Sequence, residues 1–241
     1  MLENFEDQSN QSESKNLQRK EEEDLNLKEI RHEIEDARDR LGFQIDEGIK
    51  ETVVMFNANG LTTSSSCEGH AERGLPIPYV EVSALNEPEE RFIGENKAIE
   101  KAAKKYNITV DEVEALKIEE AYVEAFKECS QNKETEEYKK WNKENEKLLE
   151  KGRVLLEEFY KARKVDPNIK LRIKEGAEYF RIHNGGENYH FIIDKEKQIS
   201  EAEKKIREER LKQYRKEMEE FTKFLKQRYF ENLKERQENK I

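Results

Sequence analysis

The feature that most constrains the fold is the regular apolar spacing along two long, highly charged stretches, residues 134–163 and 198–238. Apolar residues that recur every three or four positions form one stripe along a helix, and that stripe has to be buried. The first stripe consists of Tyr138, Trp141, Leu148, Leu155 and Phe159. The second consists of Leu211, Tyr214, Met218, Phe221 and Leu225. Helices of this length are too long to lie wholly on a small sheet. We therefore expect a long antiparallel helical pair that partly projects from the domain.

Shorter patterns predict a sheet and further helices. Strand-like segments flanked by Gly and Pro lie at about 61–67, 78–84, a hairpin over 170–184 and, as a further candidate, 188–193. Helical spacing covers about 27–41, 45–58, 96–106 and a stretch from Thr109 to Phe126, in which Glu112 completes a capping box. Gly60 suits the left-handed position just past the second of these helices. The predicted fold class is α+β: a small, mostly antiparallel sheet covered by helices on one face, with the long helical pair attached.

The chain is expected to form one domain behind a polar tail. Residues 1–22 are mainly Glu, Gln, Ser, Asn and Lys. Such a segment buries too little apolar surface to offset the entropy of ordering it, so we predict a disordered tail. Residues 23–241 are predicted to form a single α+β domain.

Composition excludes several classes of protein. The net charge is -10 with 41% charged residues, and this acidic surface disfavours nucleic acid unless a basic patch is segregated locally. No apolar run approaches the roughly 20 residues of a membrane span, and the N-terminus lacks the pattern of a signal peptide. Two cysteines, Cys67 and Cys129, are too few for a disulfide scaffold. We therefore expect a cytoplasmic protein with no membrane partner.

The segment from Thr62 to His70 concentrates the groups that do chemistry. It brings five hydroxyls, a thiol, a carboxylate, a glycine and an imidazole into nine residues, between a helical pattern and a strand pattern. Binding groups commonly collect at the end of a strand. This segment is the candidate site.

Two readings of this segment rest on Cys67. As a metal half-site, Cys67 and His70 could share an ion, but a closed zinc site needs four ligands, and His183 and His190 are the reasonable additions. We assign no metal ligand on this basis. As a nucleophile, Cys67 would be activated by His70, with Glu68 or Glu81 orienting the imidazole.

A third reading is a binding loop for an anion such as phosphate or carboxylate. The hydroxyls of Ser64, Ser65 and Ser66 and the backbone N–H groups near Gly69 could hold the anion, and His70 and Arg73 would add positive charge. The structural alternative makes Cys67 a small apolar core residue and leaves the hydroxyls at a strand edge.

A second cluster of candidate site residues lies at the end of the predicted hairpin. Period-2 alternation places Arg181 and His183 on one face of their strand, next to a Gly-Gly turn. If this strand neighbours residues 61–67, His183 and His70 would line one cleft. A solvated strand face is the structural alternative.

Two resemblances bear on the segment. Residues 60–70 fit the pattern G-x-x-T-x-x-S-C-x-G-H, and residues 78–80 continue as Pro-Tyr-Val. This resembles a group of bacterial and phage proteins in which a helix precedes the motif and a C-terminal helix carries a segment similar to residues 217–226. The likeness would cover most of residues 44–230 and implies a shared fold, but no activity.

A shorter likeness is to the wybutosine-synthesis methyltransferase family, which modifies tRNA and carries T-x-S-S-C-S-G-R near its N-terminus. Ser65, Ser66, Cys67 and Gly69 match, whereas Glu68 replaces a serine and His70 replaces an arginine. The likeness implies that such a motif can line a functional cleft. It implies neither S-adenosylmethionine nor tRNA for this chain.

The leading hypothesis is a small-ligand site, for an anion or a nucleotide-like molecule, centred on Ser65–His70. Its candidate catalytic groups are Cys67, Glu68 and His70, and its candidate ligand-binding residues are Ser65, Ser66, Gly69, Arg73, Glu81, Arg181 and His183. The alternative is a helical interaction protein that self-associates or recruits a protein partner through its long charged helices. A third hypothesis is a tRNA- or nucleotide-modifying enzyme. The sequence indicates no cofactor and does not decide between an enzyme and a binding protein.

Overall fold

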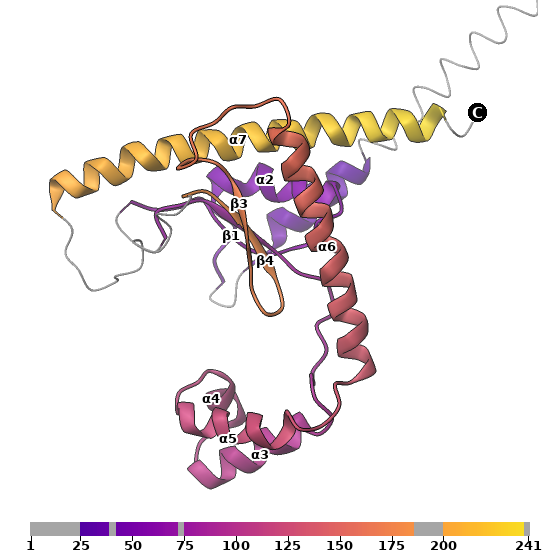
Figure 1. Cartoon of the computed structure of the whole chain (residues 1–241), viewed down its shortest axis with the longest axis vertical. Coiled ribbons are helices and arrows are strands. Elements are labelled where there is room, and N and C mark those ends of the chain that lie inside the picture. The colour runs from indigo at the N-terminus through magenta and orange to yellow at the C-terminus, as the bar shows by residue number, and fades with distance from the viewer. Residues whose placement is uncertain (1–24, 39–41, 72–74, 186–199, 239–241) are drawn as a thin grey trace, which may run out of the picture. The chain divides into compact units, whose positions relative to one another are not determined.

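The computed structural model describes residues 25–38, 42–71, 75–185 and 200–238, which form an α+β fold (Figure 1). The predicted fold class is therefore confirmed. Contacts divide the chain into two compact units, one of Met1–Ser83 with Glu150–Ile241 and one of Ala84–Leu149. The second unit encloses a hydrophobic cluster of its own, and the single domain expected over 23–241 stays a prediction. The expected tail over 1–22 lies outside the described residues.

The sheet of the first unit has four antiparallel strands in the order β1-β2-β4-β3. Their bounds are Thr63–Cys67 for β1, Tyr79–Val82 for β2, Arg172–Glu175 for β3 and Phe180–His183 for β4. The hairpin over 170–184 is present as β3 and β4, and the N–H of Gly176 donates to the carbonyl of Tyr179 at 2.8 Å in its turn. The candidate strand 188–193 lies outside the described residues.

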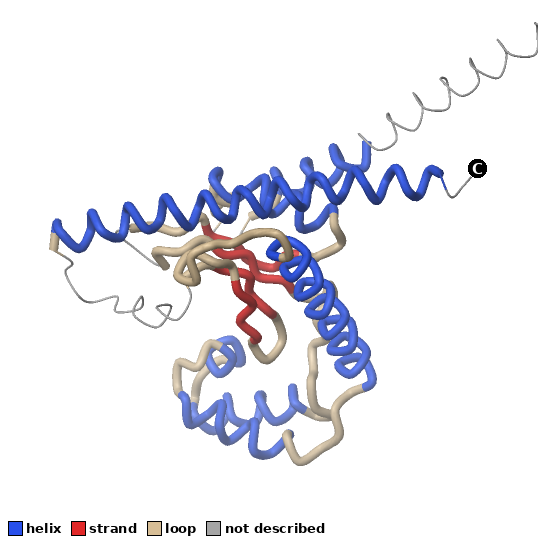
Figure 2. The backbone as a smooth tube through the Cα atoms, turned by 45° about the horizontal axis from the view of Figure 1, so that its top comes forward, coloured by secondary structure: helices blue, strands red, loops and turns tan. Residues whose placement is uncertain are grey.

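Helices cover the apolar face of this sheet (Figures 1 and 2). They are a helix over residues 25–36, α2 (Glu47–Ala58), the C-terminal part of α6 (Glu136–Tyr160) and α7 (Glu201–Glu238). α2 contacts both β1 and α7. Its Phe56 meets Phe221 of α7 edge to face, with 5.8 Å between ring centroids, and both side chains are completely buried.

The two long helices, α6 and α7, contact each other at one place rather than along their lengths. The ring of Phe159, near the end of α6, lies 5.1 Å from Phe221 and 5.5 Å from Phe224 in the middle of α7. Beside these rings, the hydroxyl of Tyr160 donates to the carboxylate of Glu217 at 2.9 Å. None of the helices in the described ranges combines the length and the apolarity needed to cross a bilayer.

The end of α2 directs the chain into β1. Gly60 has φ +66°, and its N–H donates to the carbonyl of Asn57 at 2.8 Å. The N–H of Leu61 donates to the carbonyl of Phe56 at 2.9 Å. These two bonds are the Schellman pattern, which confirms the expected role of Gly60 and satisfies the last carbonyls of the helix. Leu61 is buried directly before β1 begins.

The second unit contains α3 (Glu95–Tyr106), α4 (Val110–Glu114), α5 (Glu119–Cys129) and the beginning of α6. The capping box of Thr109 and Glu112 is present with both of its hydrogen bonds. The single helix expected from Thr109 to Phe126 is wrong, because the chain turns at Leu116, which has φ +54°. α5 consequently buries small residues, Ala121, Ala125 and Cys129, and leaves Phe126 41% exposed.

Candidate functional site

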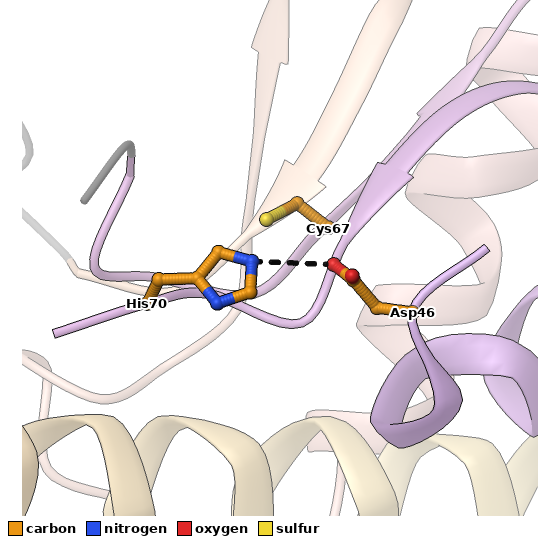
Figure 3. A group of neighbouring side chains, drawn as sticks. All are labelled: Asp46, Cys67 and His70. Carbon is orange, nitrogen blue, oxygen red and sulfur yellow. Dashed lines mark ion pairs between the residues drawn. The ribbon is translucent and has the colours of Figure 1, made fainter. Parts of the chain in front are cut away.

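Three side chains that are separate in the sequence converge beside the end of β1: Asp46, Cys67 and His70 (Figure 3). One carboxylate oxygen, the sulfur and one imidazole nitrogen all lie within 4.8 Å of one another. The closest pair is Asp46 Oδ2 and His70 Nε2 at 3.4 Å. All three residues are half-buried, so the cluster stands at the border of the protein interior and solvent.

The turn after β1 sets the spacing of Cys67 and His70. Gly69 has φ +78°, and a Cβ there would lie 2.7 Å from the carbonyl carbon of Ile77. Only glycine combines this backbone conformation with so close an approach. The N–H of Gly69 donates to the sulfur of Cys67 at 3.3 Å, and the N–H of His70 donates to the carbonyl of Leu75 at 3.0 Å. The turn therefore brings the imidazole back beside the thiol.

Asp46 occupies the N-cap position of α2, but its side chain does not cap that helix. Its Oδ2 instead accepts a hydrogen bond from the N–H of Glu68 at 3.1 Å. The exchange is reciprocal, because Glu68 Oε2 accepts from the N–H of Gly48 in the first turn of α2 at 2.9 Å. A carboxylate at this helix end is favourable, since the free N–H groups and the helix dipole are positive there. Glu68 thus caps α2, and Asp46 is released to face His70.

Arg215 of α7 fixes the same turn from the other side. Its guanidinium donates to the backbone carbonyls of Glu68 and Gly69 at 2.9 and 2.7 Å, and to Glu68 Oε1 at 2.9 Å. Both carboxylate oxygens of Glu68 are thereby engaged, one by α2 and one by α7. We expected Glu68 as a catalytic group, but these contacts indicate that it holds the turn in position between α2 and α7.

The charges around Cys67 favour a cation. Burial raises the pKa of the Cys67 thiol, and the nearby carboxylates of Asp46 and Glu68 raise it further, whereas the N–H of Gly69 lowers it. The balance keeps the thiol protonated when no cation is present. This opposes the nucleophile reading, which requires a lowered thiol pKa. A divalent cation would supply the positive charge that stabilises a thiolate.

A cavity of about 430 Å³ adjoins the cluster. Asp46 and Cys67 form part of its wall, together with the strand residues Ser64, Ser65 and Ser66. β1 is an edge strand, and because its consecutive residues line the cavity, the cavity follows that edge. Its remaining wall comes from the helix over 25–36, the segment that follows it, α2, the start of β1 and β2, through Ile34, Ala37, Arg38, Phe43, Gln44, Ile45, Val53, Thr63 and Tyr79. The volume is within the range of small-ligand sites.

The sheet places Glu81 and Arg181 against each other instead of in this cavity. They are cross-strand partners on β2 and β4, and their charged groups lie 2.6 Å apart. The guanidinium of Arg181 also lies 4.1 Å above the ring of Tyr79. Period 2 does put Arg181 and His183 on one face, as predicted, but Arg181 and Glu81 neutralise each other there.

His183 does not share a cleft with His70. The condition for that prediction was that the strand of His183 neighbours β1, but β2 lies between them. Cys67, Tyr79 and His183 occupy one row across the sheet, so His183 is two strands, or about 10 Å, from Cys67. Its side chain is buried, and Nδ1 lies 2.5 Å from the carbonyl oxygen of Asn184. Arg73 and His190, also expected near the site, lie outside the described residues.

Sequence reasoning missed Asp46 and Arg215. An aspartate directly before a helix is a common N-cap and could have drawn notice, but Ile45 extended the apparent helical stripe past it. Arg215 gave no signal, because it lies 147 residues from Glu68 and looks like any other cation on a charged helix.

Comparison of the chain with family models, with curated proteins and with solved structures found no match in any of the three. The resemblances of residues 60–70 therefore stay predictions. The chemistry of the site has to be argued from its own geometry.

Proposed function

We propose that this protein binds a divalent transition-metal ion, with zinc as the best fit, on Asp46, Cys67 and His70. The observation that carries the proposal is the convergence of three different ligand atoms within 4.8 Å of one another. Thiolate sulfur, imidazole nitrogen and carboxylate oxygen are the three ligand types that zinc takes in proteins. The Cys-x-x-His pair alone supplied two ligands, and Asp46 supplies the third.

The spacing of the Asp46 and His70 ligand atoms suits tetrahedral coordination. Zinc bonds of about 2.0–2.1 Å to oxygen and nitrogen give a tetrahedral edge of about 3.3 Å. The oxygen of Asp46 and the nitrogen of His70 lie 3.4 Å apart. The groups around the ligands also fit, because the N–H of Glu68 holds the carboxylate and the N–H of Gly69 donates to the sulfur. Such outer hydrogen bonds orient metal ligands.

Three protein ligands leave a fourth position open, which is typical of catalytic rather than structural zinc sites. The cavity along β1 reaches Asp46 and Cys67, so a small ligand in it would approach that position. We propose that this ligand is a small anion or carries an anionic group, which binds the metal, while the hydroxyls of Ser64 and Ser65 contact its polar parts. A bound metal would supply Lewis acidity. The site requires a reduced Cys67, which fits the cytoplasmic location expected from the sequence.

Zinc titration of the full chain tests the metal site. Protein stripped with a chelator is titrated with zinc by calorimetry, beside the variants His70→Ala and His32→Ala. His32 is the matched control, because it also lies near an aspartate, 3.6 Å from Asp36, but is exposed on the helix over 25–36. We expect wild type and His32→Ala to bind one zinc per chain, and His70→Ala to bind more than about 100-fold more weakly.

Equal zinc affinity in His70→Ala, or no tight binding by wild type, would contradict the metal site. Circular dichroism of each variant separates lost binding from lost folding. Native mass spectrometry of freshly purified wild type and His70→Ala then tests the ligand. A small molecule on wild type alone would identify the ligand class, and a chain with metal but no organic ligand in every preparation would count against the ligand half of the proposal.

A helical interaction surface is the second candidate function, and two exposed apolar side chains on α7 favour it. Ile206 is 55% exposed and Phe230 is 40% exposed. A double variant, Ile206→Lys with Phe230→Lys, should abolish self-association in sedimentation experiments if these residues carry it. A wild type that stays monomeric at high concentration would remove self-association from consideration.

A further inference from the structure

A second cavity, of about 540 Å³, lies in the same unit and shares no lining residue with the first. Its walls come from the helix over 25–36, the C-terminal end of α2, the last turns of α6 and the C-terminal half of α7. Asn26, Asn232 and Tyr229 contribute polar groups to it, and Ile30 and Leu155 contribute apolar surface. Its volume is within the range of small-molecule sites.

The charge of this cavity is opposite to that of the protein. Lys151, Arg228 and Arg236 line it, with Glu150 as the one carboxylate among the lining residues, whereas the whole chain has a net charge of -10. Arg228 is paired with Glu158 at 2.6 Å. Within the described ranges, no carboxylate lies at ion-pair distance from Lys151 or Arg236. Lys151 and Arg236 therefore have no anionic partner among the residues that the structure describes.

The environment of Lys151 is unfavourable for its positive charge. Burial of its ammonium group lowers the pKa of Lys151, and the nearby charges of Arg236 and Arg228 lower it further. Its Nζ lies 3.5 Å from the carbonyl oxygen of Gly60, past the end of α2. A structural reading would make Lys151 a cap for this helix, because a cation is favourable at a helix C-terminus. The contact between Lys151 and Gly60 would explain Lys151 as a helix cap, but it gives Arg236 no role at the end of α2.

We propose that this cavity binds a small phosphorylated molecule of about mononucleotide size. A phosphomonoester carries about two negative charges near neutral pH, which matches the charges of Lys151 and Arg236. The guanidinium of Arg236 would hold phosphate oxygens through paired N–H groups, and the ammonium of Lys151 would act as a point charge. The aliphatic wall of Ile30 and Leu155 would take the rest of the molecule. This site is independent of the metal site.

Binding of AMP to the full chain tests the proposal, with adenosine as the probe that lacks the phosphate. Calorimetry is run with chelator present on wild type, Lys151→Met, Arg236→Met, Lys223→Met and His70→Ala. Lys223→Met is the control, because it also removes one positive charge but at a position outside the cavity. In the wild type, Lys223 on α7 pairs with Glu220 at 2.6 Å. We expect AMP to bind wild type and Lys223→Met equally, and at least about 10-fold more weakly to the two cavity variants. Adenosine should bind wild type far more weakly than AMP does.

Four results would overturn the proposal. Wild type would fail to bind AMP, or adenosine would bind as well as AMP does. AMP affinity would be unchanged in the two cavity variants, with Lys151→Met only lowering the melting temperature, as expected of a helix cap. Alternatively, AMP binding would be lost in His70→Ala and kept in Lys151→Met, which would assign the anion to the site at Cys67.

Discussion

At the residue scale, the position of one loop depends on one arginine. Arg215 makes three hydrogen bonds to Glu68 and Gly69, and these residues in turn hold Asp46 and the sulfur of Cys67. The groups that would bind a metal are therefore placed by residues that never touch it. Outer interactions of this kind commonly tune metal affinity by about 10–100-fold.

Replacing Arg215 by Met tests this arrangement. We expect the variant to lose about 2 kcal/mol of unfolding free energy in urea, because the carbonyls and the carboxylate lose a charged donor. The matched control is Arg207→Met, also on α7, whose guanidinium pairs with Glu203 one turn away at 2.8 Å. Such an exposed pair contributes only about 0.5 kcal/mol. Equal losses in the two variants would refute the special role of Arg215.

Gly69 provides a second test at this scale. Gly69→Ala forces a left-handed backbone on alanine and puts its Cβ 2.7 Å from both Ile77 and Leu211. Gly42→Ala imposes nearly the same backbone strain, at φ +83°, but has nothing within 4 Å of the new Cβ. We expect costs of about 3 and about 1 kcal/mol in urea unfolding. Similar costs would mean that the turn is looser than its geometry indicates.

His183 should make stability depend on pH. Burial lowers the pKa of His183, and the positive charges of Arg181, Lys174 and Arg172 add to this effect. The unfolded chain then binds a proton more readily than the native chain, so stability falls as the pH drops below the unfolded value of about 6.5. His183→Gln should flatten this dependence in urea titrations between about pH 8 and about pH 5. His32→Gln, on an exposed position, should leave the slope unchanged, and a wild-type slope in His183→Gln would contradict the account.

At the element scale, α7 stabilises the first unit through one face. Phe221 is completely buried and contacts rings from both α2 and α6, whereas Phe230 on the same helix is 40% exposed. Phe221→Ala should cost about 4 kcal/mol in urea unfolding, and Phe230→Ala less than about 1 kcal/mol. A loss of similar size in both variants would show that α7 is not anchored by this face.

Elements could be predicted where local chemistry decides them. The Schellman turn at Gly60, the capping box at Thr109 and the alternation of Phe180 to His183 all depend on residues a few positions apart. The turn at Leu116 could not be predicted, because leucine rarely adopts the left-handed conformation that it has there, between two helices that both pack on α3. The site was half predictable for the same reason: Cys67 and His70 are neighbours in sequence, whereas the fold brings in Asp46.

At the scale of the whole molecule, the surroundings of Cys67 and the second cavity differ in charge. The carboxylates of Asp46 and Glu68 lie near Cys67, whereas Lys151 and Arg236 line the second cavity. Each cavity has a polar composition that a closed core would not tolerate without a partner. The second unit contributes no residue to either. Both proposed binding sites therefore lie in the unit that contains the sheet.

Cobalt substitution tests the central claim, metal binding by Asp46, Cys67 and His70, most directly. Co²⁺ replaces zinc in such sites and, unlike zinc, absorbs light, with a sulfur-to-metal charge-transfer band only when a thiolate is bound. Full-length wild type stripped of metal is titrated with Co²⁺ beside Cys67→Ser and Cys129→Ser, the latter removing a thiol buried in the other unit. We expect a saturating thiolate band at one Co²⁺ per chain in wild type and Cys129→Ser, and its loss in Cys67→Ser. No band in wild type, or an unchanged band in Cys67→Ser, would contradict this claim.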